Sequence, residues 1–259
     1  MDLNLEATKV EYEQAGKGPD LLLLHSLLTE LTVFEGVLPA LAAHRRVTRI
    51  NLPGFGRSTP VPLDTVAAHA DHVAKVMDGL RLPSDTAVFG NGFGAFVALE
   101  LAIRHGQRFG ALLVADTLAA FPEAARVPFR GMAERVTSTG MHAVLDTAIG
   151  RMLPPAFAER HPEAVAKRKQ ALGAVDPACF ARACLALASM DLTPQLTKIR
   201  NRTLVMCGEQ DQTTPPALAK ALADAIPPAR YRAIAGSGHC PMLEQPEALV
   251  RLIEEFLAS

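Results

Sequence analysis

Three segments of the chain carry residue types that together could perform acyl-transfer chemistry. An apolar stretch over 87–91 runs into a glycine-rich turn centred on Gly92. Asp211 follows a second apolar stretch, and His239 lies in a loop further along the chain. Histidine is a base near neutral pH, and a carboxylate can fix its tautomer and stabilise its charged form. The order of turn, acid and base is therefore that of a hydrolytic triad, but Gly92 has no side chain with which to attack.

The turn at Gly92 has the layout of a nucleophile elbow, the sharp strand-to-helix turn Gly-x-Ser-x-Gly. Here the pattern is Gly90-Asn91-Gly92-Phe93-Gly94, so glycine stands at the serine position. Glycine adopts positive φ without strain, and we expect the turn to keep its shape while lacking the hydroxyl. A dinucleotide-binding turn is a weaker interpretation, because that fingerprint belongs after the first strand of its unit and this turn follows the third candidate buried strand.

A second loop is placed where it could help to form an oxyanion hole. His25-Ser26-Leu27-Leu28-Thr29 comes directly after the apolar run 20–24. In an elbow-type site this loop donates one oxyanion-hole N–H and the residue after the nucleophile donates the other. The predicted donors are the amides of Leu27 and Phe93, and Ser26 and Asn91 are predicted to contact the substrate. The alternative is an ordinary loop in which Ser26 bonds to nearby backbone.

The elements that must position these residues alternate at both ends of the chain. Strands are predicted at 8–13, 20–24, 46–50, before Gly92, at 110–115, at 203–207 and at 230–234. Helical patterns lie between them, at 34–43, 63–80, 93–105, 215–225 and 247–257. This alternation predicts an α/β fold with a doubly wound, mostly parallel sheet flanked by helices.

The middle of the chain breaks the alternation. Residues 118–196 contain amphipathic helical pieces separated by prolines, Pro128 among them, and contain no good strand. We therefore predict a core of 1–117 and 197–259, with a helical cap, 118–196, inserted after the sixth strand. Such a cap lies over the crevice where open α/β sheets bind ligands, and it can exclude water. The apolar cap residues predicted to line the site are Leu118, Val127, Phe129, Val136, Leu145, Met152 and Phe157, of which Phe129 and Leu145 are predicted to bind substrate.

The amino-acid composition limits the kinds of partner that we expect for this protein. The 259 residues carry a net charge of −1, without the basic clusters of a nucleic-acid-binding protein. The N-terminus has no signal-peptide pattern, no stretch of 18 apolar residues occurs, and the four cysteines lack metal-site spacing. We expect a cytoplasmic protein that acts on a small molecule, without metal, cofactor, membrane or nucleic acid. The sequence leaves the oligomeric state open.

Four motifs together resemble those of the α/β-hydrolase superfamily. They are Asn51-Leu52-Pro53-Gly54-Phe55-Gly56-Arg57-Ser58, the elbow, Gly208-Glu209-Gln210-Asp211, and Gly236-Ser237-Gly238-His239-Cys240-Pro241. Within it, Ser26-Leu27-Leu28-Thr29-Glu30 and the segments 176–180 and 188–192 look like the 3-oxoadipate enol-lactonase and small-esterase branch. The resemblance implies hydrolysis of an ester or lactone. Meta-cleavage C–C hydrolases share much of the pattern and remain an alternative. The chain departs from the family's pattern at Gly92 and at Leu28, where a loop glycine is usual.

Gly92 leaves three interpretations open. It is an engineered replacement of serine, or a native residue in an enzyme whose histidine activates water, or the mark of a binding or sensor protein that lost its chemistry. Rescue by another side chain ranks below these. The candidates for it are Ser26 and Cys240 as nucleophiles and Asp116, at the end of the strand 110–115, as an alternative acid.

Overall fold

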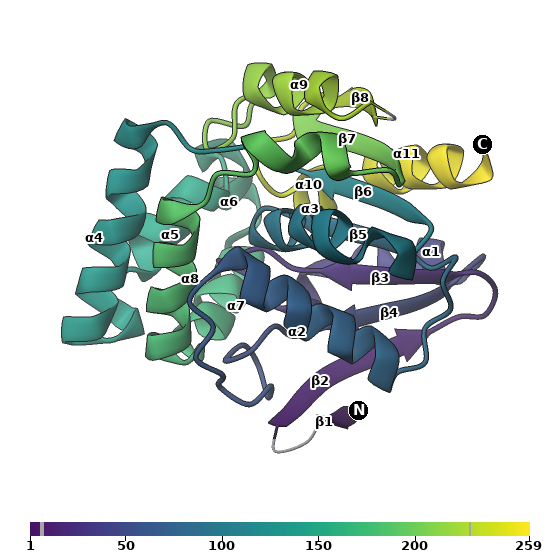
Figure 1. The fold of residues 1–259 in the computed structure, drawn as a ribbon. Helices are drawn as coiled ribbons and strands as arrows, with labels where there is room; N and C mark the ends of the chain where they lie inside the picture. Colours follow the sequence, from purple (N-terminus) through teal and green to yellow (C-terminus); the bar gives the residue numbers. More distant parts are fainter. Residues whose placement is uncertain (6–7, 228) are drawn as a thin grey trace.

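The computed structural model describes residues 1–5, 8–227 and 229–259, and within them eight strands form one sheet (Figure 1). The strand order is β1-β2-β4-β3-β5-β6-β7-β8. The bounds are β1 Asp2–Leu5, β2 Thr8–Ala15, β3 Asp20–Leu24, β4 Arg46–Ile50, β5 Ala87–Asn91, β6 Ala111–Ala115, β7 Arg202–Gly208 and β8 Ala229–Ile234. Only the pairings β1–β2 and β2–β4 are antiparallel, so the predicted mostly parallel sheet is confirmed.

The central strands are buried along their whole length. Every residue of β3, β5 and β6 is buried, as their continuous apolar sequences predict for strands that are covered on both faces. Helices α2 (Val66–Gly79) and α3 (Phe93–His105) pack together over one face, and α1 (Leu38–Ala42) and α11 (Pro246–Ala258) lie on the other (Figure 1). Strand β1 was not predicted, because its four residues alternate between exposed and half-buried and pair only with β2 at the sheet edge.

Five helices separate β6 from β7 and form the cluster beyond the end of the sheet in Figure 1. They are α4 Glu123–Thr139, α5 Leu145–Met152, α6 Pro155–Arg160, α7 Pro162–Gly173 and α8 Pro177–Ser189. Prolines start α6, α7 and α8, where the missing N–H costs no hydrogen bond. Pro128, predicted to separate two helices, instead lies within α4. The two ends of the insertion meet where the Leu192 N–H donates to the Ala119 carbonyl at 3.0 Å.

The remaining helices of the described structure are η1 Leu31–Phe34, η2 Gly106–Arg108, α9 Pro216–Ala225 and α10 Pro241–Glu244 in the core, η3 Met141–Ala143 between α4 and α5, and η4 Thr193–Lys198 before β7. No single helix in the described ranges is long and apolar enough to cross a bilayer, and α7 with α8, bent by 100°, meets that test only as a pair.

Candidate active site

The turn at Gly92 has the backbone shape of an elbow. Gly92 links β5 directly to α3 with φ 51° and ψ −117°, a conformation that side-chain-bearing residues adopt only under strain. The flanking glycines are needed for close approach. A Cβ atom built on Gly90 would lie 2.3 Å from the Gly94 carbonyl oxygen, and one built on Gly94 would lie 2.3 Å from the Leu24 carbonyl oxygen. The turn is therefore packed against β3 with no room for larger residues on either side of the centre.

His239 and Asp211 are brought together from the loops after β8 and β7. His239 Nδ1 lies 2.9 Å from Asp211 Oδ2, and both residues are buried. Asp211 is held in place by three further hydrogen bonds. Its Oδ1 accepts from the Thr213 and Thr214 N–H groups at 2.8 and 3.1 Å, and its Oδ2 accepts from Thr214 Oγ1 at 2.6 Å. The carboxylate is thus fixed in one orientation toward the imidazole.

His239 and Asp211 shift each other's pKa values. Burial alone would lower the pKa of His239, but the charge of Asp211 and its hydrogen bond raise that pKa to about 9. Burial would raise the pKa of Asp211, but His239 and Thr214 together hold it well below its usual range. The ionic form, imidazolium beside carboxylate, is therefore favoured at neutral pH.

The other ring nitrogen of His239 faces the turn. A Cβ atom built on Gly92 would lie 3.2 Å from His239 Nε2. The same point lies only 2.3 Å from Ser26 Oγ and 3.0 Å from Ser26 Cβ. The side chain of Ser26 thus fills the space beside Gly92 that a side chain at position 92 would need.

The two predicted oxyanion donors lie on the same cavity. Leu27 and Phe93 both line it, together with Gly92 and His239. The Phe93 N–H is at the first position of α3, where no intrahelical acceptor exists. The Leu27 N–H has no acceptor in the part of the chain that the structure describes. Both amides are therefore free to bind a ligand oxygen.

The cavity is narrow and mostly apolar, and the space in it that no atom fills, with the open solvent at its mouth included, is about 430 Å³. Its lining consists of Ser26, Leu27, Leu28, Gly92, Phe93, Phe96, Phe121, Phe129, Met132, Arg151, Leu187, Thr213, Thr214 and His239. Phe129 and Ser26 lie where the sequence places them. Phe129 is the one member of the predicted cap lining that reaches the cavity, and Val127 is 57% exposed.

Asn91 and Leu145 do not line the cavity. The Asn91 side chain points behind the turn, where Nδ2 donates to Asp116 Oδ2 at 2.8 Å and to the His239 carbonyl at 3.2 Å. Leu145 faces α7, since a Cβ atom built on Gly173 would lie 3.7 Å from its Cδ1. The strand and the helix turn these two side chains away from the cavity, so the structure does not bring them together with the other predicted site residues.

Arg151, near the end of α5, is a charged residue of the cavity lining that the sequence analysis did not predict. Its guanidinium lies 5.5 Å from the centre of the Phe129 ring and, within the described ranges, has no carboxylate at ion-pair distance. Burial lowers the pKa of this guanidinium. The basic residue in the last turn of an amphipathic helix is visible in the sequence, but the direction in which it points depends on how α5 packs.

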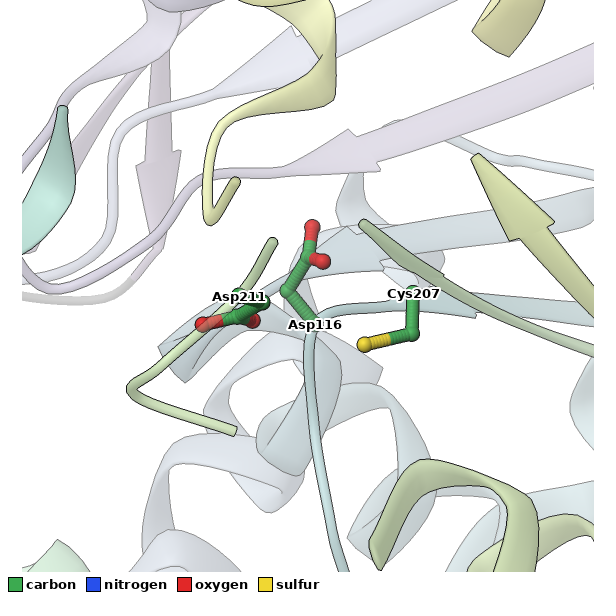
Figure 2. A group of neighbouring side chains, drawn as sticks. All are labelled: Asp116, Cys207 and Asp211. Carbon is green, nitrogen blue, oxygen red and sulfur yellow. The ribbon is translucent and has the colours of Figure 1, made fainter. Parts of the chain in front are cut away.

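Asp116, Cys207 and Asp211 form a buried group with ligand atoms within 4.8 Å of one another (Figure 2). Their polar atoms are already engaged. Asp116 accepts from the Gly208 N–H at 2.9 Å and from Asn91, and Cys207 Sγ donates to the Thr214 carbonyl at 3.3 Å. Burial, reinforced by Asp211, raises the pKa of Asp116 well above its usual range, and burial also raises that of the Cys207 thiol. Within this group Asp116 connects three strands, because it follows β6 and accepts from Asn91 of β5 and from the Gly208 N–H of β7.

The other rescue candidates are placed differently from Ser26. Cys240 is fully buried, does not line the cavity, and has its thiol pKa raised far above normal, first by burial. Asp116 makes no hydrogen bond to His239 in the described structure, since Asp211 takes that place. The loop that carries His239 is held by Glu244, which accepts from the Gly238 and Cys240 N–H groups at 2.7 and 2.9 Å.

These features define the class of the protein, and a family model agrees. Residues 21–252 match the alpha/beta hydrolase family, and the chain belongs to that family. The predictions of the α/β-hydrolase fold and of the esterase and enol-lactonase branch are thereby confirmed.

Individual relatives fit this branch. The chain is 30% identical to a pimeloyl-[acyl-carrier protein] methyl ester esterase of Aeromonas hydrophila, over 96% of this chain and 99% of that protein. It is 32% identical to the polyketide synthase ThaQ of Burkholderia thailandensis over 96% of its length, but spans only 12% of that protein. The crystal structure of the enol-lactonase from Burkholderia xenovorans LB400 superposes with a TM-score of 0.93 at 27% identity, covering both chains fully.

Proposed function

We propose that the protein hydrolyses a small ester or lactone, with His239 as general base and Asp211 as its orienting acid. The observation that carries this proposal is the orientation of the His239 ring. Its Nδ1 is held by Asp211, while its Nε2 lies 3.2 Å from the point where a side chain at position 92 would begin. A base aimed at the nucleophile position is the arrangement that a triad requires.

The geometry supports a simple sequence of proton transfers. His239 Nε2 takes the proton of an attacking hydroxyl as its oxygen adds to the substrate carbonyl. The Leu27 and Phe93 amides hold the resulting oxyanion, and Asp211 stabilises the imidazolium. When the C–O bond of the ester breaks, the leaving alkoxide takes the proton back from His239. The attacking oxygen itself is not supplied by Gly92.

The substrate that fits the cavity is apolar with an acidic group. The phenylalanine side chains provide an apolar wall, and Arg151 places a partly buried positive charge in it, with no ionic partner among the residues that the structure describes. An uncompensated charge in such a site is costly, and a substrate carboxylate would offset that cost. The relatives named above, which include a methyl ester esterase and an enol-lactonase, support ester and lactone bonds as the target.

We assign the helical insertion, residues 118–196, the role of a cap over this site. Met132 of α4, Arg151 of α5 and Leu187 of α8 all reach the cavity from it. In this arrangement the core supplies the reacting groups and the cap supplies the groups that recognise substrate. We also propose that the protein is cytoplasmic, as the sequence analysis predicts.

The test is turnover of p-nitrophenyl butyrate and of the monoester p-nitrophenyl hydrogen glutarate by the purified protein. We expect hydrolysis of both, lost at least ~10³-fold in His239→Ala. The matched control is His142→Ala, which removes an exposed imidazole from η3 and leaves the rate unchanged. Binding without turnover in every variant would instead identify a sensor, and unchanged rates in His239→Ala would refute the site.

A further inference from the structure

The contacts of Ser26 indicate where the attacking oxygen comes from, if the protein has the hydrolase function proposed above. A Cβ atom on Gly92 would be 2.3 Å from Ser26 Oγ, far inside van der Waals contact. The hydroxyl of Ser26 therefore occupies the space of the absent side chain, on the same cavity as His239.

The backbone of Ser26 is held rigidly at this place. Its N–H donates to Thr29 Oγ1 at 3.1 Å, and its carbonyl accepts from the Thr29 N–H at 3.2 Å. The same carbonyl lies 2.8 Å from His25 Nδ1, while His25 Nε2 accepts from the Leu52 N–H at 3.0 Å. Burial lowers the pKa of His25 to about 4, so the ring is neutral with its proton on Nδ1. Such surrounding contacts are what hold a reactive group in a productive position.

The hydroxyl of Ser26 is free for chemistry. Ser26 lines the cavity, and within the described ranges its Oγ is not engaged in a hydrogen bond to another protein group. The next residue along the chain is Leu27, one of the two amides available for an oxyanion. In an ordinary elbow the N–H of the residue after the nucleophile likewise serves the oxyanion hole. Ser26-Leu27 thus repeats the relationship that position 92 and Phe93 would have.

We propose that Ser26 is the nucleophile of this enzyme, with its hydroxyl delivered from the loop after β3 in place of a serine at position 92. Ser26 Oγ adds to the substrate carbonyl carbon, and its proton passes to His239 Nε2. The C–O bond to the leaving alkoxide breaks, and His239 protonates that alkoxide. Water then adds to the Ser26 ester, giving a proton to His239. The carbon–Oγ bond breaks and Oγ regains the proton.

A glycine at position 92 is compatible with Ser26 as the nucleophile. A serine at position 92 would place its Cβ 2.3 Å from Ser26 Oγ, so the Ser26 hydroxyl would have to rotate away from its present position. Glycine leaves the Ser26 hydroxyl where it is and keeps the turn unstrained at φ 51°. The glycine and the neighbouring serine are then two parts of one arrangement.

Covalent labelling tests the proposal. The protein is incubated with a fluorophosphonate, which replaces fluoride at phosphorus by a serine oxygen, and the adduct is mapped by peptide mass spectrometry. We expect one adduct, on Ser26, that is absent from Ser26→Ala. Hydrolysis of p-nitrophenyl butyrate falls about 10³-fold or more in that variant. The control is Ser189→Ala, which alters an exposed serine on α8 and changes neither labelling nor rate.

A double variant separates chemistry from misfolding. Ser26→Ala combined with Gly92→Ser removes the 2.3 Å clash and places a hydroxyl in the elbow. We expect the label to move to position 92 and activity to return at least tenfold over Ser26→Ala. If Ser26→Ala keeps the wild-type rate and His239→Ala does not, water is the nucleophile and this proposal falls while the hydrolase function stands. If both variants keep the wild-type rate, the proposed function falls as well.

Discussion

At the scale of single residues, the ionisation of His239 controls when the site can act. The imidazole must be neutral to accept a proton, and Asp211 raises its pKa to about 9 against the effect of burial. Below that pH the base is mostly protonated, so kcat/KM should rise about tenfold per pH unit from pH 6 to 8 and level off above about 9. Initial rates with p-nitrophenyl butyrate, corrected for spontaneous hydrolysis, measure this profile.

Asp211→Asn is the informative comparison. It removes the largest charge that raises the pKa of His239 and leaves burial, which lowers that pKa, against the smaller effects of Asp116 and Glu244. We expect the inflection of the pH profile to move to lower pH while the plateau rate falls. A wild-type profile that is already flat from pH 7 upward would show that His239 is neutral in the working enzyme.

At the scale of elements, much of the site follows from strand ends that the sequence reveals. The apolar runs of β3, β5 and β7 are plain in the sequence, and the residues just after them are Ser26, Gly92 and Asp211. The C-terminal ends of parallel strands share one edge of the sheet, so these residues were predicted to meet. Which way a side chain points within a loop or a helix is set by packing, and for that reason the placements of Asn91 and Leu145 were not predictable.

The direction of Arg151 on helix α5 was likewise not predictable from the sequence. Its position leads to a prediction about the substrate. Arg151 faces the cavity only because of how α5 is rotated against its neighbours. In Arg151→Met we expect kcat/KM for p-nitrophenyl hydrogen glutarate to fall about 10- to 150-fold, the range for losing a hydrogen bond to a charged group. The rate for neutral p-nitrophenyl butyrate should change less than threefold.

Arg135→Met provides the matched control for Arg151→Met, because Arg135 is an exposed residue of α4 that does not line the cavity. Its kinetics with both esters should match the wild type. An equal loss on both esters in Arg151→Met would mean that Arg151 supports the fold of the insertion and does not select an acidic substrate.

At the scale of the whole molecule, the site depends on a buried polar group that joins the central strands. Asp116 receives the Gly208 N–H from β7 and the Asn91 amide from β5, and Asn91 also donates to the carbonyl of His239. Asp116 directly follows β6 and connects that strand to the polar group. Its backbone has φ 56°, a value that is rare outside glycine. Three strands and the histidine loop therefore share one set of hydrogen bonds.

Asp116→Ala should accordingly weaken the molecule globally. It leaves the buried Gly208 N–H without its acceptor and removes one acceptor from Asn91, which together cost about 2–4 kcal/mol in the free energy of unfolding. Urea unfolding followed by circular dichroism measures the change, with Asp146→Ala, an exposed carboxylate on α5, as control. Because Asn91 holds the His239 loop, kcat should fall in the same variant at temperatures where it remains folded. An unfolding midpoint equal to that of the control would mean that the strands hold their register without Asp116, and that the position of His239 is set by Glu244 and Asp211 alone.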